Sequence, residues 1–225
     1  PPRWPVNVPA LPAEDLELVR PFLELAESLG RLHAALLRGA PRTVDLDHQG
    51  ILPRERLRIV SGHFLVGLLG RIVDEPINYV NSPVIARERG IRVREGLGPD
   101  SRGYSELVQT SVGEDSSVTT VAGALLDRSQ ARIVEMDGFG LDLTPRDFVV
   151  LLWNREPEKP GFVGTIGKVL GAAGINILSI QVGHEVVDAQ GLMAVTVPEP
   201  VGAKVLDEVA RLPGVARLVT VDFGG

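Results

Sequence analysis

The sequence predicts an α+β protein of two domains, each with its own sheet and its own helices. Two long segments in the first third of the chain repeat apolar residues at helical spacing, and a series of short β-branched runs follows them. After residue 145, strand-like and helix-like segments alternate in the order βαββαβ. A chain of 225 residues is also long enough for two compact domains.

The first predicted domain, residues 11–145, begins with a helix over Leu11–Leu37. Pro12 and two acidic residues suit its first turn, and Pro21 predicts a bend or a division. A second helix is expected over Pro53–Asp74. Its internal glycines lower helix propensity and therefore indicate close packing at Gly62, Gly67 and Gly70.

The remaining elements of this domain are short. Asn81-Ser82-Pro83 predicts the capped start of a helix that runs through Arg89. Polar turns between β-branched runs indicate hairpins and hence a mostly antiparallel sheet. The strands are expected at Pro41–Asp47, Ile91–Glu95, Ser105–Val112, Val118–Leu125, Ala131–Met136 and Phe139–Leu143.

The second predicted domain, residues 146–225, has the ferredoxin-like βαββαβ order. A helix opened by Pro160-Gly161 ends near Gly171 and Gly174, and a second helix covers Gly202–Leu212. Two helices cover only one face of a four-stranded sheet, so the exposed edges favour pairing with another copy. The strands are expected at Phe148–Trp153, Ile175–Val182, Gly191–Val197 and Val215–Phe223.

Composition excludes several functional classes. The net charge of −6 argues against a general nucleic-acid binder, because a phosphate backbone requires a basic surface. The absence of cysteine excludes disulfides and thiol catalysis and is compatible with the cytoplasm. The four histidines lack metal-ligand spacing, and no apolar run is long enough for a membrane span. His63, on an apolar helix face, is expected to be a packed core or interface residue.

The polar loop Asn154–Lys159 lies directly before the helix that Pro160-Gly161 opens. Free N–H groups and the helix dipole at such a position favour an anion, for example a carboxylate. This arrangement is typical of a small-ligand pocket.

Four separated blocks of the second domain resemble the ACT domain that ends bacterial D-3-phosphoglycerate dehydrogenases. They are Lys159-Pro-Gly-Phe-Val-Gly-Thr-Ile-Gly167, Gly174-Ile-Asn-Ile177, Ile180-Gln-Val-Gly183 and Gly191-Leu-Met-Ala194. Two blocks of the first domain are similar to the intervening, or allosteric substrate-binding, domain of the same family: Tyr79-Val-Asn-Ser-Pro-Val-Ile-Ala-Arg-Glu-Arg-Gly90 and Met136-Asp-Gly-Phe-Gly140. Residues 1–10 resemble the segment that leaves the catalytic part, and the chain lacks an initiator Met. We therefore expect a piece of a longer protein.

The resemblance implies the regulatory region of a dehydrogenase in L-serine biosynthesis. NAD-dependent oxidation of 3-phosphoglycerate would occur elsewhere in the polypeptide, and this chain would hold no catalytic residue, cofactor or metal. L-serine or a related amino acid would bind between paired ACT domains of a cytoplasmic dimer or tetramer. Two other interpretations stay open, namely the regulatory part of an L-serine dehydratase and a free-standing ligand-sensing or dimerisation module.

The resemblance also assigns effector-binding residues. Asn176, with Ile175 beside it, matches the position that hydrogen-bonds the ligand. From the residues alone, an Asn between apolar runs more often satisfies the backbone groups of a turn. Glu158 matches an acidic position suited to the ligand's ammonium group, N–H groups around Gly161 suit its carboxylate, and Asn154 is a further candidate. The loop is one residue longer than the family pattern and lacks its histidine.

Arginines in the first domain form a second candidate, an anion site of Arg92, Arg94 and Arg102. Guanidinium groups that converge on one point bind a phosphate bidentately. Arg87 and Arg89 lie close by in sequence, and the next basic position of the family pattern falls near Thr110. The alternative is a solvated face in which glutamates pair with these arginines.

Overall fold

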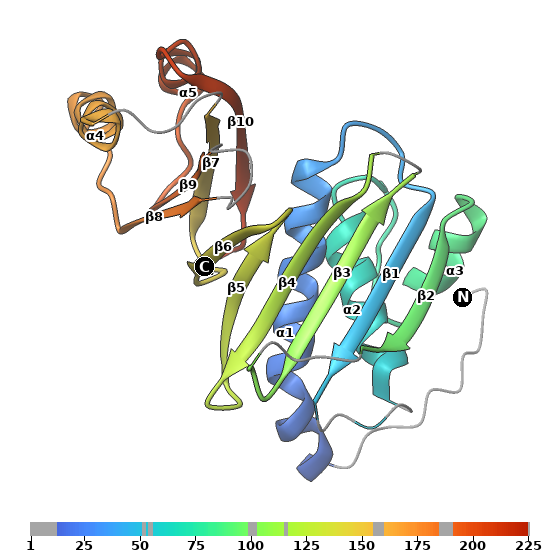
Figure 1. The fold of residues 1–225 in the computed structure, drawn as a ribbon. Helices are drawn as coiled ribbons and strands as arrows, with labels where there is room; N and C mark the ends of the chain where they lie inside the picture. Colours follow the sequence, from blue (N-terminus) through green and yellow to red (C-terminus); the bar gives the residue numbers. More distant parts are fainter. Residues whose placement is uncertain are drawn as a thin grey trace. The chain divides into compact units, whose positions relative to one another are not determined.

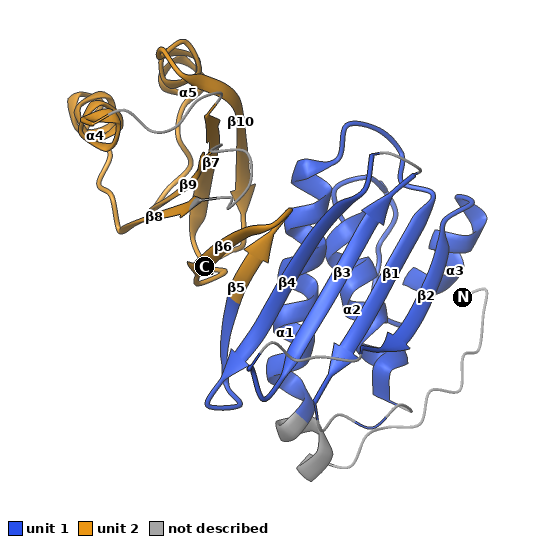
Figure 2. Cartoon of the chain, viewed as in Figure 1, with its two compact units in different colours: residues 1–132 blue, residues 133–225 orange. Residues whose placement is uncertain are grey.

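The computed structural model describes residues 13–50, 53, 56–98, 103–114, 117–154, 160–184 and 191–224, without the side chains of 13–18 and 184. Within these ranges the fold is α+β, with two mostly antiparallel sheets and five helices, as predicted. The chain divides into two compact units, Pro1–Arg132 (unit 1) and Ile133–Gly225 (unit 2), coloured separately in Figure 2. The predicted boundary between the two domains, after residue 145, stays a prediction.

The larger sheet has the strand order β2-β1-β3-β4-β5-β6. Its first four strands belong to unit 1, whereas most of β5 and all of β6 belong to unit 2 (Figure 2). Strand β1 is parallel to β2, and a crossover containing α2 and α3 joins them, whereas β1 is antiparallel to β3 and β3 to β4 (Figure 1). The helices are α1 (Ala13–Leu36), α2 (Leu57–Leu69) and α3 (Ser82–Glu88), and the strands are β1 (Thr43–Gln49), β2 (Arg92–Leu97), β3 (Leu107–Gly113), β4 (Thr119–Leu126), β5 (Gln130–Met136) and β6 (Phe139–Leu143).

Helices α1 and α2 cross in close contact because each carries a glycine at the crossing. A Cβ on Gly30 would lie 2.1 Å from the carbonyl oxygen of Phe64, and a Cβ on Gly67 would lie 2.0 Å from that of Glu27. Gly62 similarly lies against the Tyr79 carbonyl. The close packing predicted at Gly62 and Gly67 is therefore confirmed, and its partners are backbone atoms.

Three local predictions in unit 1 were wrong in whole or in part. Helix α1 is not divided at Pro21, because Val19, Phe22 and Leu25 bury its face on either side of the proline; a bend there stays a prediction. Helix α2 is shorter than predicted, and Gly70 ends it. Asn81 occupies the N-cap position of α3 but gives the helix no side-chain bond; its Oδ1 instead accepts the N–H of Asn78 at 2.7 Å.

Unit 2 contains a four-stranded antiparallel sheet of order β10-β7-β9-β8, and its two helices lie on one face of that sheet (Figure 1). Val150, Leu152, Met193 and Val195 of the central strands pack with Ile166, Leu170 and Val209 of the helices. The elements are β7 (Phe148–Asn154), α4 (Phe162–Ala172), β8 (Ser179–His184), β9 (Gly191–Val197), α5 (Ala203–Ala210) and β10 (Val215–Asp222). The βαββαβ order is confirmed, although β8 begins four residues later than predicted.

Candidate functional site

The first half of the predicted effector site lies where β7 ends and α4 begins. Asn154 is the last residue of β7, and only 3% of its surface is exposed. Residues 155–159, which include Glu158, lie outside the described ranges. Gly161 is the N-cap of α4 in the left-handed conformation, with φ 93°. It is exposed, so the N–H groups of the first helical turn, which have no intrahelical acceptor, face a surface.

The second half of the site lies beyond the other end of α4. Gly174 has φ 75°, its N–H bonds the Gly171 carbonyl, and the Ile175 N–H bonds the Leu170 carbonyl at 2.9 Å. These are the two bonds of a Schellman motif, and Ile175 packs on the same core as Leu170. Backbone groups alone therefore close this turn, and the Ile175–Leu178 segment is held out of the predicted strand.

Asn176 follows this turn with an exposed side chain. Among the described residues it makes no hydrogen bond to the turn, which the Schellman bonds already satisfy. The interpretation that the Asn176 side chain satisfies backbone groups of this turn is therefore not supported. Its amide, which carries both a donor and an acceptor, is accessible at the surface.

Within one copy, the structure does not bring the two halves of this site together. Gly161 precedes α4 and Asn176 follows it, and the helix between them contains 11 residues. At a rise of 1.5 Å per residue, the two ends are about 16 Å apart. A small amino acid is far shorter than this distance, so one α4 cannot contact a single ligand through both ends.

The surface beside α4 is apolar and uncovered. Val163 on the helix is 39% exposed, and Leu178 just before β8 is 50% exposed. Strand β8 is the edge of its sheet and pairs only with β9 among the described strands. At Gly164, Gly167 and Gly171, no other part of the described chain lies within 4 Å of the position that a Cβ would occupy.

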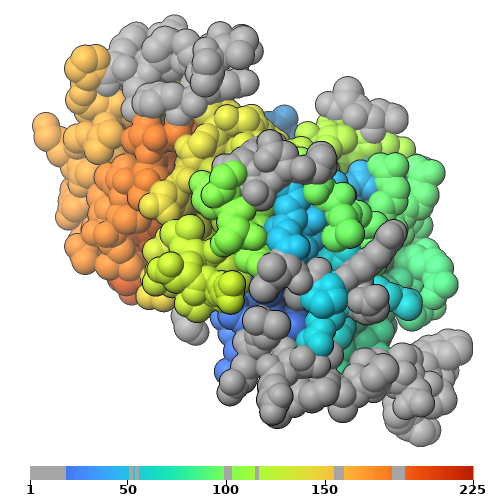
Figure 3. Space-filling view, turned by 60° about the horizontal axis from the view of Figure 1, so that its bottom comes forward, coloured from blue at the N-terminus to red at the C-terminus, as the bar shows by residue number. Residues whose placement is uncertain are grey.

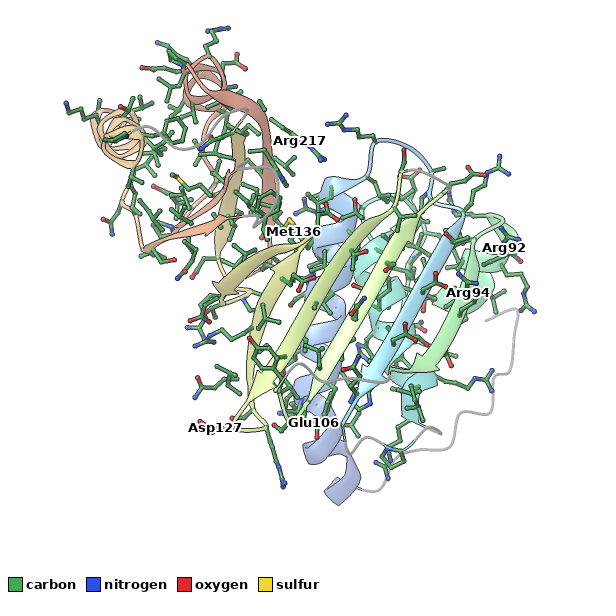
Figure 4. The ribbon with its side chains drawn as sticks, in the orientation of Figure 1. Arg92, Arg94, Glu106, Asp127, Met136 and Arg217 are labelled. Atoms are coloured by element: carbon green, nitrogen blue, oxygen red, sulfur yellow. The ribbon has the colours of Figure 1, made fainter. Side chains whose placement is uncertain are left out.

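The arginine candidates of unit 1 lie on the edge strand β2, where Arg92 and Arg94 point to the same side (Figure 4). Arg94 faces Asp45 across the strand pair, and its Nη2 donates to Asp45 Oδ2 at 2.6 Å while its Nε donates to Oδ1. This bond, with the charges of Asp45 and Asp47, raises the pKa of Arg94 above its usual value. A phosphate at Arg94 must therefore compete with a carboxylate that is already bound.

The other members of this candidate set do not converge on Arg94 in the described residues. Arg102 lies outside the described ranges, and Arg87 and Arg89 are exposed at the end of α3. This stretch of α3 and β2 forms part of the surface of unit 1 (green, Figure 3). Thr110, near which the family pattern places a basic residue, is fully buried. The arrangement resembles a paired, solvated face more than a prepared phosphate site.

Two buried histidines are polar features that the sequence reasoning missed. His33 Nε2 lies 2.9 Å from Thr110 Oγ1, and that hydroxyl donates its own proton to the Val121 carbonyl. Nε2 must therefore carry the proton, and Nδ1 is an acceptor without a partner in the described residues. Because charging the ring would leave a buried N–H unpaired, burial lowers the pKa of His33 to about 3.

His48 forms a second buried pair with Glu106, whose Oε2 lies 3.2 Å from His48 Nε2 (Glu106, Figure 4). Burial lowers the pKa of His48, and the Glu106 carboxylate offsets part of that shift. His48 lies on the same face of β1 as the buried Val44 and Leu46, and His33 follows Leu29 by one helical turn. This spacing was the sequence signal that could have predicted the burial of both histidines. His63, in contrast, is partly exposed and stacks on Tyr79 with ring centroids 5.2 Å apart.

The described residues contain no cluster of His, Asp or Glu side chains able to hold a metal ion. No helix within the described ranges is long and apolar enough to cross a membrane.

Comparison with known proteins identifies the family. Residues 18–137 match the model of the D-3-phosphoglycerate dehydrogenase intervening domain, which covers β1–β5 and most of α1. The chain belongs to this family. The D-3-phosphoglycerate dehydrogenase of Synechocystis is 33% identical over 98% of the chain, and those of Methanocaldococcus jannaschii and Bacillus subtilis are 29% and 25% identical over 97%. The chain covers only 40–41% of these relatives.

Proposed function

We propose that this chain is the regulatory region of a D-3-phosphoglycerate dehydrogenase and that it senses L-serine through paired copies of unit 2, an ACT domain. The opposite placement of Gly161 and Asn176 at the two ends of α4 carries this proposal. In an isologous pair with antiparallel α4 helices, the start of one helix faces the end of the other. Each pair then forms two complete sites.

The chemistry of the two halves suits an amino acid. The first-turn N–H groups after Gly161 would bind the carboxylate, and Glu158 would bind the ammonium group. Asn176 of the second copy would hydrogen-bond the ligand through its amide. Asn154 is buried, so its role would be to support the loop that carries Glu158. The exposed Val163 and Leu178 supply an apolar seam for the pairing. The outer edge of β8, which pairs with no strand other than β9 in the described ranges, supplies backbone hydrogen-bonding groups beside it.

Regulation would follow from differential affinity. L-serine that binds one arrangement of the paired copies more tightly shifts the population toward it. Coupling of this kind is typically about 1–3 kcal/mol. NAD and 3-phosphoglycerate would bind the remaining part of the polypeptide, in a cytoplasmic dimer or tetramer. The dehydrogenase relatives favour this assignment over an L-serine dehydratase or a free-standing module.

Calorimetric titration with L-serine tests the proposal, with glycine and L-alanine as ligand controls. We expect saturable binding of L-serine that Asn176→Ala abolishes. Lys168→Ala, a change on the exposed surface of the same helix, is the matched control and should keep binding. A folded, paired chain that gives no heat at millimolar L-serine would contradict the proposal.

A mixing experiment tests the shared site directly. Glu158→Ala and Asn176→Ala damage opposite halves, so neither variant alone should bind. When equal amounts are mixed and allowed to exchange, half of the pairs contain one copy of each variant and therefore one intact site. Recovery of about a quarter of the wild-type binding capacity is then expected for an isologous pair. No recovery in confirmed mixed pairs would place both residues in one copy's site.

A further inference from the structure

Strand β6 lies against β8 at a contact that only glycine permits. A Cβ on Gly183 would lie 2.6 Å from the carbonyl oxygen of Gly140, 3.2 Å from Leu141 Cδ2 and 3.4 Å from Phe139 Cβ. Gly183 is buried, and Ile180 and Val182 of the same strand pack with the helices of unit 2. Gly183 therefore presents the backbone of β8 to the backbone of β6 on the sheet face opposite α4 and α5.

The strand that receives this contact belongs to a tight β-hairpin with a register shift between Ile133 and Glu135. Asp137 and Gly138 both have positive φ, 47° and 87°, which is the two-residue turn that matches the twist of paired strands. Met136 pairs with Phe139 beside the turn, and Ile133 pairs with Leu143 at the far end. All four side chains are at most 4% exposed. A displacement of β6 therefore carries β5 with it.

The strand that makes the contact continues directly from the proposed effector residue. β8 begins three residues after Asn176, and the Leu178 N–H bonds the Thr196 carbonyl at 2.8 Å. Ser179 Oγ also bonds Thr196 Oγ1 at 3.0 Å. The ladder to β9 then runs through Gly183 to His184. Ordering or shifting the Asn176 end of β8 therefore reaches Gly183 through one hydrogen-bonded strand.

We propose that the Gly183–Gly140 contact transmits effector binding from β8 to the β5–β6 hairpin. The inference rests on the proposed L-serine site for its input, but the contact is a separate feature of the fold. Its physical basis is a pair of backbones in van der Waals contact, which cannot move independently in close-packed protein. The output is the β5–β6 hairpin, whose two strands pair with each other. Gly183 is a positioning residue with no contact to the ligand.

Amide hydrogen exchange of the full chain tests this inference with L-serine as the probe. In the wild type we expect L-serine to slow exchange at residues 130–143 by about fivefold or more, the lower range of typical coupling. Gly183→Ala places a methyl group on the Gly140 carbonyl and should abolish this effect while residues 176–182 still respond. Gly140→Ala is the matched control, because a Cβ there has no atom within 4 Å, and it should behave as the wild type.

The outcomes separate the two proposals. Calorimetry on the same samples reports L-serine binding, and its absence overturns the serine-sensing role. In that case the Gly183–Gly140 contact is tested without L-serine, by comparing amide exchange at low and high chain concentration. Pairing of two copies at high concentration would itself order β8. Two results overturn the Gly183–Gly140 coupling. In one, L-serine or a higher chain concentration slows exchange in β8 but not in residues 130–143. In the other, the effect of L-serine on residues 130–143 survives Gly183→Ala. Equal loss in Gly140→Ala also overturns it, since the hairpin's general stability would then explain the effect.

Discussion

In unit 1, Gly30 and Gly67 each lie against the backbone of the other helix. In unit 2, by contrast, Gly164, Gly167 and Gly171 of α4 have no neighbour among the described residues within 4 Å of a Cβ position. The same sequence signal, a glycine inside a helix, therefore has two structural meanings. In unit 1 the space is already filled by the chain itself. In unit 2 the space is open, which fits a helix whose outer face meets another molecule.

The largest effect should come from filling the crossing in unit 1. Gly67→Ala places a methyl carbon 2.0 Å from the Glu27 carbonyl, and a backbone atom cannot rotate away. We expect a loss of about 3 kcal/mol or more in the free energy of unfolding. Urea unfolding followed by circular dichroism measures it. Gly39→Ala, where a Cβ has no neighbour within 4 Å, is the control, and an equal loss there would contradict the crossing argument.

The filled core of unit 1 should also make its stability depend on pH. His33 has a folded-state pKa of about 3, below the usual 6.5, so the unfolded chain binds the extra proton first. Stability is therefore complete above pH 6.5 and falls as pH decreases, by about 2 kcal/mol between pH 6.5 and 5 for one such group.

Two variants isolate this contribution. His33→Gln should flatten the slope of unfolding free energy against pH, leaving the part that His48 contributes. Thr110→Val leaves the His33 N–H without its acceptor and should lower stability at every pH by about 1–3 kcal/mol while keeping the slope. An unchanged slope in His33→Gln would show that this histidine is not the group that titrates.

The smallest effect on the free energy of unfolding should come from the exposed glycines of α4, where we expect a gain in stability instead of a loss. Gly164→Ala adds a methyl group to an exposed helical position, so we expect the unfolding free energy to rise by up to about 1 kcal/mol. The same methyl should weaken association if α4 faces a second copy. Unfolding at low chain concentration and sedimentation equilibrium separate the two effects, and stronger association would contradict the proposed seam.

The sequence allowed strands to be placed best where glycines or tight turns bound them. Phe139–Leu143 and Gly191–Val197 match β6 and β9 residue for residue. Ile175–Leu178 was misplaced because its β-branched residues are typical of a strand, whereas the Schellman turn and the Leu178–Thr196 bond fix the chain there. Local patterns contain neither interaction.

The candidate sites were harder to predict, because the surroundings of their residues are set by parts of the chain that are distant in sequence. Asn154 and Asn176 both border apolar runs, yet one is buried and the other exposed. Arg94 is neutralised by Asp45, which is 49 positions away and becomes its neighbour only through the register of β1 and β2. Glu158 and Arg102 lie outside the described residues, and their roles stay predictions.

The position of β1 has a consequence for how unit 1 is made. β1 is the first of the described strands, but both of its neighbours, β2 and β3, come after residue 91. During synthesis, one edge of β1 therefore stays without its native partner until β2 is complete at residue 97, and the other until β3 is complete at residue 113. Non-local pairing of this kind slows folding and leaves strand edges open to wrong partners. A nascent or truncated chain that stops before β3 would be the form most prone to aggregate.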